Sequence, residues 1–331
     1  MFSKQFDFIA IGDITTDAFI KLKEASVHCD INKENCQICM NFGDKIPYES
    51  VDVVRAVGNS ANAAVAASRL GLRATLIADI GNDENGKECL EALKENRVSE
   101  RFVTTHKGML TNYHYVLWYE DDRTILVKHQ DYPRTLPKFP EPKWIYLSSL
   151  GDNSEIYHEE IATYLVAHPD VKLAFQPGTF QMELGVEKLK DIYKRTDIFF
   201  VNKEEAQRIL KSKEEDIKNL TVMLAKLGPK VVVITDGPKG AYTYDGKDTF
   251  FMPLYPDPKA PYERTGAGDA FASTFTVALA KGLSIENALR WAPINSMSVV
   301  QYVGAQKGLL SEKDLLDWLD KAPKSYQPKK I

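Results

Sequence analysis

The sequence predicts a three-layer α/β/α fold in which helices cover both faces of a mostly parallel central sheet. Short apolar segments such as Phe6–Ile11 and Lys230–Thr235 have the composition of buried strands. Between such segments lie stretches with small and apolar residues at helical spacing, of which Asn59–Leu70 is the first. Strands that alternate with helices along a chain form parallel sheets covered on both faces.

The alternation continues through the middle of the chain. The further segments with strand character are Ala74–Ile80, Trp144–Ser148, Val171–Phe175 and Asp197–Val201. The segments with helical character are Ser154–Val166, Met182–Tyr193, Glu204–Leu210 and Ile217–Leu227. We therefore expect one sheet built from successive β–α units.

The last third of the chain is expected to be a hairpin followed by helices. The hairpin strands are Gly240–Tyr244 and Thr249–Met252, because the intervening Asp-Gly pair favours a tight turn. The helical segments that follow are Ala267–Lys281, Ser284–Val303 and Glu312–Asp320. Pro293 is expected to kink or break the second of them.

Two segments do not follow the alternation. Asp17–Val54 has no helical pattern, and Tyr113–Lys128 has the pattern of two strands around a turn. We expect a small β layer from about residues 17–54 and 109–130 that projects from the sheet. No repeat or low-complexity linker divides the chain, so residues 1–331 are expected to form a single domain, with 322–331 as a frayed tail.

The composition is typical of an ordinary globular protein, with 44% apolar and 27% charged residues and a net charge of −4. A mildly acidic chain argues against nucleic acid as a partner, because nucleic-acid binding depends on Lys and Arg that neutralise phosphates. No stretch approaches the ~20 apolar residues of a membrane span, and the N-terminus lacks a signal-peptide pattern. Four cysteines are too few for a disulfide scaffold. We therefore expect a cytoplasmic protein that binds neither nucleic acid nor membrane.

The strongest functional signal is the glycine-rich turn Thr265–Phe271, which opens directly into a helix. Gly266, Ala267 and Gly268 would present the amide groups of a helix start to a ligand, which makes the turn a candidate anion site. Asp269 would repel an anion there unless it has its own task, and general-base chemistry on a hydroxyl during phosphoryl transfer supplies one. The alternative is that the glycines only allow close packing and Asp269 caps the helix.

The segment Thr265–Phe271 resembles the C-terminal signature of the ribokinase-like, or PfkB, carbohydrate kinases. Other segments resemble further signatures of that family in the same order. They are Gly12–Asp17 for its opening sugar-contacting turn, Gly58–Asn62 for its N-terminal glycine signature, Asn202–Glu205 for its Asn-x-x-Glu motif and Thr235–Gly240 for its nucleotide-contacting loop. The matches run from about Phe6 to Gly308, so the resemblance covers essentially the whole chain and implies a ribokinase-like fold.

The resemblance implies a role for each matching residue. Asp269 would be the catalytic base, and the amides of Gly266, Ala267 and Gly268 would form the anion hole for the transferring phosphoryl group. The acceptor-binding residues would be Asp13, Asp17, Gly58, Asn59 and Asn62. The nucleotide-binding residues would be Asn202, Thr235, Gly237, Gly240 and Asn295. Glu205 would organise Mg²⁺ through water, since this hard cation takes few direct protein ligands.

Local alternatives stay open for several of these residues. Asp13 and Asp17 would cap turns, and Asn62 would face solvent on its helix. Asn202 and Glu205 would belong to a strand end that caps the next helix.

By the same resemblance, the small β layer would be the lid that covers the sugar and excludes water. Lys128, His129 and Gln130 end one of its strands, where they would either touch the substrate or face solvent. The family's lid often pairs with a second copy, which implies a homodimer through the lid as a candidate assembly.

Three residues depart from the family pattern. Val57 replaces the first glycine of the N-terminal signature, which alters the shape expected around the acceptor. Glu263 stands where the family usually has Asp, and Arg264 where it has a small hydroxyl residue. A monovalent cation such as K⁺ therefore remains an open candidate cofactor. Arg264 would either pair with a phosphate, or face solvent or form a weak ion pair with Glu263.

The cysteines Cys29, Cys36 and Cys39 lie in the expected lid, and Cys89 lies beyond it. With His28 before them they suggest a zinc site, because the Cys-x-x-Cys of Cys36 and Cys39 is half of a structural site, but the sequence has no second Cys-x-x-Cys. The preferred interpretation is that these thiols pack as small hydrophobic groups.

The expected function is ATP- and Mg²⁺-dependent phosphorylation of a hydroxyl on a sugar or nucleoside. The sequence has no Walker A motif, and no Gly-x-Gly-x-x-Gly follows the first strand, which excludes the common P-loop and dinucleotide sites. Two alternatives stay open. One is a non-catalytic sugar- or nucleoside-binding regulatory protein on the same fold, and the other is a kinase for sugar phosphates, in which Arg264 or Lys128 would supply charge.

Overall fold

The structure is a computed structural model that describes residues 6–29, 36–120 and 122–331. Within these ranges the central sheet has ten strands in the order β16-β15-β14-β13-β12-β11-β10-β1-β6-β7. It is parallel from β7 to β13 and antiparallel from β13 to β16. The strands are β1 (Phe8–Ile11), β6 (Ala74–Gly81), β7 (Ser99–His106), β10 (Trp144–Leu147), β11 (Lys172–Phe175), β12 (Ile198–Asn202), β13 (Val231–Thr235), β14 (Ala241–Tyr244), β15 (Thr249–Met252) and β16 (Lys329–Lys330).

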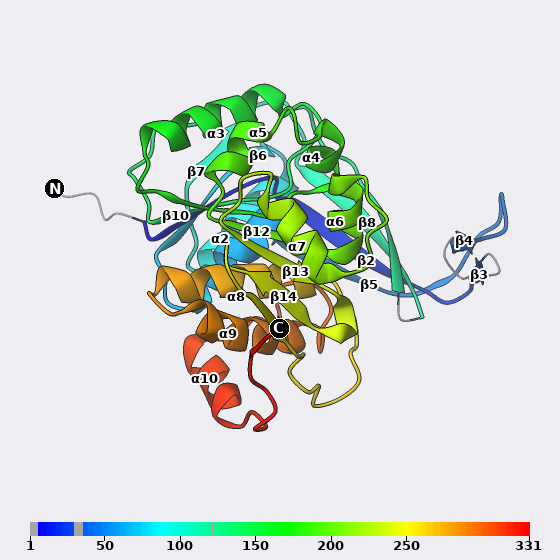
Figure 1. The fold of residues 1–331 in the computed structure, drawn as a ribbon. Helices are drawn as coiled ribbons and strands as arrows, with labels where there is room; N and C mark the ends of the chain where they lie inside the picture. The colour runs from blue at the N-terminus through cyan, green and yellow to red at the C-terminus, as the bar shows by residue number, and fades with distance from the viewer. Residues whose placement is uncertain (1–5, 30–35, 121) are drawn as a thin grey trace.

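Helices cover both faces of this sheet (Figure 1). One layer contains α1 (Asn59–Arg69), α2 (Glu84–Glu95), α8 (Ala267–Ala280), α9 (Ile285–Val299) and α10 (Glu312–Asp320). The other contains α3 (Glu155–Ala167), α4 (Thr179–Leu184), α5 (Lys190–Arg195), α6 (Lys203–Leu210) and α7 (Ile217–Ala225). Strand β1 shows why both faces are apolar, because Phe8 and Ala10 pack into the first layer while Ile9 and Ile11 pack into the second. The expected three-layer fold is confirmed.

A second sheet has the order β5-β2-β8-β9, and we call it the lid sheet. Its strands are β2 (Thr15–Leu22), β5 (Tyr48–Val57), β8 (Asn112–Tyr119) and β9 (Asp122–Leu126). Because β2 starts four residues after β1 ends, the lid sheet rises from the carboxyl edge of the parallel strands. Figure 1 shows β2, β5 and β8 extending away from the body toward the two-stranded sheet of β3 (Ser26–His28) and β4 (Gln37–Cys39).

One helix expectation is corrected, and of the two alternatives for Pro293 the break is excluded. The helix expected over Met182–Tyr193 is two short helices, because Gly185 ends α4 with a positive φ of 83°. Pro293 does not break its helix, since α9 continues over Ile285–Val299. Most of the second half of α9 is buried against neighbouring elements, so packing overrides the local preference of proline.

The expectation of a frayed tail at 322–331 is wrong. Tyr326 is only 1% exposed, and its hydroxyl donates to the carbonyl oxygen of Arg290 at 2.7 Å. Beyond it, Lys329 and Lys330 form β16, which pairs with β15. The lysines of the tail made it look like a solvated end, whereas one buried tyrosine and an edge-strand pairing hold it in place.

The interpretation of the lid cysteines as packed thiols also needs correction. Cys29 and Cys36 form a disulfide that joins the ends of β3 and β4, and Cys39 is partly exposed. Cys89 does pack as a small hydrophobic group, since it is fully buried in the core beneath the lid sheet. In the described part of the chain, no helix has the length and apolar character that crossing a bilayer requires.

Candidate active site

The glycine-rich turn forms the start of α8, as its composition suggests. Gly266 precedes the helix with a φ of 81°, a left-handed conformation that favours glycine. A Cβ atom at this position would lie 2.3 Å from the Cβ of Ala305, so the 263–268 turn and the 304–306 segment pack too closely for a side chain. The amide of Ala270 makes the first helical hydrogen bond, to Gly266, so the preceding amides lie at the helix start where an anion is stabilised.

Asp269 lies in the first turn of α8, and three side-chain amides donate to its carboxylate. Asn59 donates to Oδ1 at 2.9 Å, Gln176 donates to the same oxygen at 3.1 Å, and Asn62 donates to Oδ2 at 2.8 Å. Burial raises the pKa of Asp269, the three donors and the charge of Arg123 oppose that rise, and the net direction is upward. The carboxylate is therefore both held in place and made more basic than an ordinary aspartate.

The two asparagines reach Asp269 because α1 begins beside the turn between β1 and β2. Gly58 precedes α1 with a φ of 103°, and a Cβ there would lie 2.8 Å from the carbonyl oxygen of Asp13. Asn62 is buried, and its Oδ1 accepts a hydrogen bond from Gln306 Nε2 at 3.0 Å. This second contact fixes the amide orientation of Asn62, so that its Nδ2 donates to Asp269.

Gln176 follows β11, and its position was not anticipated from the sequence. Its Oε1 accepts a hydrogen bond from the fully buried hydroxyl of Tyr146, and its Nε2 donates to Asp269. Tyr146 thereby orients the amide of Gln176. The sequence did carry a signal for Gln176, because it directly follows an apolar strand, and polar residues at the carboxyl ends of parallel strands often line the ligand site of such sheets.

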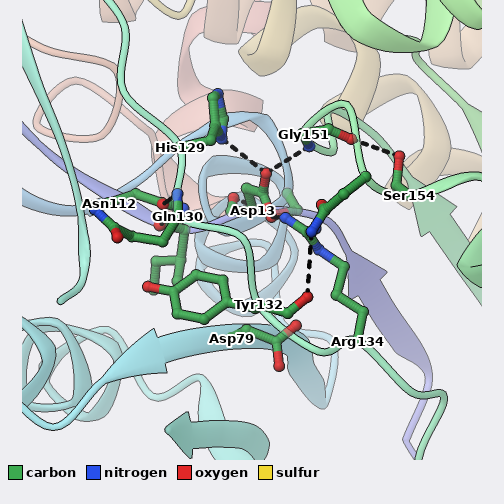
Figure 2. A network of polar contacts seen from close by, with 12 residues as sticks. Asp13, Asp79, Asn112, His129, Gln130, Tyr132, Arg134, Gly151 and Ser154 are labelled. Atoms are coloured by element: carbon green, nitrogen blue, oxygen red, sulfur yellow. Dashed lines mark hydrogen bonds and ion pairs between the residues drawn. The ribbon is translucent and has the colours of Figure 1, made fainter. Parts of the chain in front are cut away.

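Asp13 lies at the centre of a buried polar network (Figure 2). Its Oδ1 accepts a hydrogen bond from Arg134 Nη2 at 2.8 Å, and its Oδ2 accepts one from the amide of Gly151 at 2.7 Å. His129 Nδ1 lies 2.9 Å from Oδ2. Burial raises the pKa of Asp13, but His129 and Arg134 more than offset that effect, so the net direction is downward. The structure thus shows Asp13 holding the 129–134 and 151 segments together.

Asp17 lies on β2 beside His114 of β8, with 3.4 Å between Oδ1 and Nδ1. In the described part of the structure, Asp17 Oδ1 and His114 Nε2 are buried atoms without a well-formed hydrogen bond. The rings of His114 and His129 meet edge to face at 5.3 Å between centroids. The acceptor candidates Asp13 and Asp17 are therefore connected through two histidines that the sequence did not single out as a pair.

The candidates for nucleotide and metal lie at the ends of β12 and β13, where Asn202 and Thr235 are register partners. Asn202 caps α6 by accepting from the amide of Glu205 at 2.8 Å, and Glu205 Oε2 accepts from the amide of Asn202 at 2.8 Å. The helix-capping alternative is thus present in the structure. Burial raises the pKa of Glu205, the amide of Asn202 opposes the rise, and the charge of Asp269 adds to it.

The other nucleotide candidates divide into two groups. Gly237 starts a short 3-10 turn over Gly237–Lys239, and Gly240 follows it, so both lie in the loop after Thr235. Asn295 does not join them. It is fully buried in α9, where it donates to Thr274 Oγ1 at 2.8 Å and accepts from the amide of Leu310 at 2.9 Å.

The segment before the anion turn carries two of the departures from the family pattern. Glu263 is buried and accepts from the amide of Thr265 at 2.7 Å and from its hydroxyl at 2.5 Å. It also accepts from the amide of Gly304 at 3.4 Å, so it ties the anion turn to the segment that packs on it. Arg264 is exposed, and its charge lowers the pKa of Asp257, which burial otherwise raises.

Comparisons with known proteins identify the family to which this chain belongs. A family model described as pfkB family carbohydrate kinase matches residues 20–312. An ATP-dependent 6-phosphofructokinase of Thermoanaerobacterium thermosaccharolyticum is 24% identical over 328 residues, which cover 91% of this chain and 90% of that protein. A cytidine kinase of Thermococcus kodakarensis is 30% identical over 237 residues, which cover 70% of this chain and 83% of that protein.

Solved structures show the same fold. Arabidopsis thaliana ribokinase complexed with ribose and ATP superposes with a TM-score of 0.79, at 21% identity, over 95% of this chain and 99% of that one. The family match covers most of the sequence, including both strand ends that carry Asn202 and Thr235 and the turn that carries Asp269. The chain therefore belongs to the pfkB family of carbohydrate kinases.

Proposed function

We propose that this protein transfers the γ-phosphoryl group of ATP to a hydroxyl of a sugar or nucleoside, with Asp269 as the general base. The observation that carries the proposal is the carboxylate of Asp269 at a glycine-lined helix start, held by two side-chain amides of α1 and by Gln176, which follows β11. Its raised pKa makes it a better proton acceptor than an ordinary aspartate. The names of the relatives, which include a phosphofructokinase and a cytidine kinase, support this class of acceptor.

In the proposed reaction, Asp269 accepts the hydroxyl proton as the acceptor oxygen bonds to the γ-phosphorus. The bond from that phosphorus to the β–γ bridging oxygen breaks, and ADP leaves with the electron pair. The amides of Gly266, Ala267 and Gly268 stabilise the charge on the transferring group, helped by the positive end of α8. The proton remains on Asp269 until solvent removes it after product release.

Mg²⁺ would be held near Glu205 and Asn202. Burial and the nearby charge of Asp269 both raise the pKa of Glu205, so a cation between these carboxylates would relieve an existing repulsion. One carboxylate and one amide suit a cation that keeps most of its waters and binds phosphate oxygens. When bound, Mg²⁺ would neutralise charge on the phosphates. Thr235, Gly237 and Gly240 would line the nucleotide. Replacing K⁺ by Na⁺ in the assay tests whether the reaction requires a particular monovalent cation.

On the acceptor side, we assign direct contacts to Asp17, Asn59 and the backbone at Gly58, and assign Asp13 a supporting role. Asp17 Oδ1 is a buried acceptor, suited to a substrate hydroxyl. Asp13 is already saturated by Arg134, His129 and Gly151, which argues for a role in shaping the pocket.

The experiment is a panel assay with ATP, Mg²⁺ and free sugars, nucleosides and sugar phosphates. One class of acceptor should consume ATP, and Asp269→Asn should lower kcat on the order of 10²-fold to 10⁴-fold with little change in Tm. Asp191→Asn is the matched control, because that carboxylate is exposed on α5. Full activity in Asp269→Asn would contradict the base assignment. Sugar binding without ATP consumption would favour a non-catalytic binding protein.

A kinase for sugar phosphates is the second candidate, favoured by the similarity to a 6-phosphofructokinase and by the exposed Arg264. Comparing fructose with fructose 6-phosphate in the same panel separates the two. A preference for the phosphate ester that disappears in Arg264→Met would support this candidate.

We also propose that the outer face of the lid sheet pairs with a second copy. Val53, Tyr115 and Leu126 lie in one register row that crosses β5, β2, β8 and β9, and all three are exposed on either side of the small, buried Ala18 of β2. An apolar row on a sheet face favours association. Light scattering should report a dimer for the wild type and a monomer for Tyr115→Lys. A monomeric wild type would exclude the proposed pairing through the lid sheet.

A further inference from the structure

Gln306 connects two elements of the site that lie far apart in the sequence. Its side-chain Nε2 donates to the carbonyl oxygen of Ala56 at 2.7 Å and to Oδ1 of Asn62 at 3.0 Å. The residue is only 6% exposed and follows Ala305, which packs on the anion turn. One buried amide group therefore links the segment beside the anion turn to the beginning of α1.

The backbone of Gln306 is also held by α1. Its carbonyl oxygen accepts a hydrogen bond from Nη1 of Arg69 at 2.7 Å, and the same nitrogen donates to the carbonyl oxygen of Leu309 at 2.9 Å. Arg69 is the last residue of α1, so both ends of this helix contact the same segment. The amide group of Gln306 therefore has a fixed position relative to Asn62.

A backbone carbonyl decides which way the two side-chain amides point. The carbonyl oxygen of Ala56 can only accept, so Gln306 must turn its nitrogen toward it. The second hydrogen on that nitrogen then points to Asn62, which must present its oxygen there and its nitrogen to Asp269. The side chain of Asn62 is thereby restricted to donating to the carboxylate.

Ala56 itself has an unusual backbone conformation. Its φ of 55° lies in the left-handed region, which residues with a Cβ atom seldom adopt. Such residues persist where surrounding contacts determine their conformation, and they cluster at functional sites. The hydrogen bond from Gln306 is one such contact, three residues before Asn59, which starts α1 and also donates to Asp269. Gln306 therefore supports the positions of both asparagines.

The restriction on Asn62 bears on the protonation of Asp269. An ionised carboxylate only accepts hydrogen bonds, whereas a protonated carboxyl group also donates one. Asn62 could accept from a protonated Asp269 only by turning its oxygen inward, and Gln306 opposes this rotation because that oxygen already accepts from it. The arrangement thus favours the ionised form of Asp269, which is the form that can take a proton from an acceptor hydroxyl.

Charged and titratable groups of other elements also face Asp269. Burial has the largest effect on its pKa and raises it, and the charge of Arg123 on β9 lowers it. Burial raises the pKa of Glu205 on α6 and of Tyr146 on β10, and the charge of Asp269 adds to both effects. A substitution of Gln306 leaves all of these side chains in the protein, so its effect on Asp269 can be measured against a constant background.

We propose that Gln306 is a positioning residue that locks Asn62 as a hydrogen-bond donor to Asp269 and so keeps the carboxylate ionised. The inference rests on the proposed function for the role of Asp269 as general base. Gln306 acts through Asn62 and the start of α1, and not by contact with a substrate.

The test compares Gln306→Met and Gln306→Glu with the wild type. Methionine cannot donate, so Asn62 becomes free to accept from a protonated Asp269, and the pKa of that carboxyl group should rise by about one unit. An ionised glutamate only accepts, so Asn62 should donate to it and turn its oxygen toward Asp269, which should raise the pKa further. The pKa of Asp269 should therefore increase from the wild type to Gln306→Met to Gln306→Glu.

The pKa is measured without turnover, from the carboxyl resonance of Asp269 in protein isotopically labelled at its aspartate side chains. Asp269→Asn assigns that resonance by removing it. The acid limb of kcat/KM on the acceptor found in the panel should move in parallel. Gln301→Met is the matched control, because Gln301 is also buried and also donates to a backbone carbonyl, that of Lys259 at 3.4 Å. It should lower Tm without moving the resonance.

A double variant separates positioning from a general loss of packing. In Asn62→Ala the amide that Gln306 orients is gone, so adding Gln306→Met should produce less than half of the pKa shift that it produces in the wild type. An equal shift in the two backgrounds would overturn the inference.

An unmoved Asp269 resonance in folded Gln306→Met would also overturn the inference, and this variant decides the matter if Gln306→Glu does not fold. An inactive wild type whose resonance still moves in the expected order would count against the proposed function and leave the positioning of the carboxylate intact.

Discussion

Replacing Gln176 with methionine should raise the pKa of the catalytic base and move the acid limb of the rate profile to higher pH. Gln176 Nε2 donates to Asp269 Oδ1 at 3.1 Å and stabilises the charged carboxylate. A hydrogen bond to a charged group contributes about 1.5–3 kcal/mol, and one pKa unit corresponds to about 1.4 kcal/mol. Because Asn59 and Asn62 remain as donors, we expect a shift of about one unit.

The assay is kcat/KM against pH on the free enzyme, where the acid limb reports the base. The carboxylate acts only when ionised, so a higher pKa moves the loss of activity to higher pH and leaves the plateau above the acid limb almost unchanged. Asp191→Asn is again the control, because its carboxylate is exposed on α5 and lies outside the site. An active Gln176→Met variant with an unmoved acid limb would refute the assignment of Asp269 or its hydrogen bonds.

Three further predictions concern residues around the site. Arg134→Met should lower the free energy of unfolding by about 3–5 kcal/mol in chemical denaturation, since Arg134 is 2% exposed and pairs with Asp13. Because His129 and Arg134 lower the pKa of Asp13 on folding, its stabilisation should be present above about pH 4, be lost as pH falls through the folded value, and be smaller in Arg134→Met, where His129 remains. Gly266→Ala should reduce kcat far more than Tm, because the new methyl group would meet Ala305 and shift the anion turn; a normal kcat would contradict the role of this turn. Asn295→Leu should lower stability by about 1–3 kcal/mol with KM for ATP unchanged, and a raised KM would place Asn295 in the nucleotide site.

The arrangement of the central sheet could be predicted from the sequence because its strands are buried on both faces. Phe8–Ile11 and Val231–Thr235 are continuous apolar segments, and such segments separated by helices allow few alternatives to a parallel sheet. The edge at β16 could not be predicted in this way. Its two lysines carry no apolar pattern, and Tyr326, which lies just before them in the sequence, is buried through a contact with the distant Arg290.

The site was predictable where residues occur in short motifs, and unpredictable where they come singly from irregular segments. Asn59 and Asn62 were candidates before their contacts with Asp269 were known, although about 200 residues separate them from it. Gln306 and Arg134 lie in stretches without helical or strand periodicity, so nothing in their neighbours indicates a role. Only the packing of α1 against the 304–306 segment reveals what Gln306 does.

The capping of α6 and the proposed metal role of Glu205 can be separated, because capping uses hydrogen bonding and metal binding uses charge. Glutamine serves as well as glutamate at the third position of a capping box, so Glu205→Gln should keep both hydrogen bonds to Asn202 and nearly the wild-type Tm. The same change removes the negative charge beside Asp269, so the Mg²⁺ concentration needed for half-maximal rate should rise several-fold. Glu205→Ala should lose both properties, with a fall of about 0.5–2 kcal/mol in stability. If Glu205→Gln showed unchanged Mg²⁺ dependence, Glu205 would be a helix cap alone, and the cation would have to be held by the phosphates and other residues of the site.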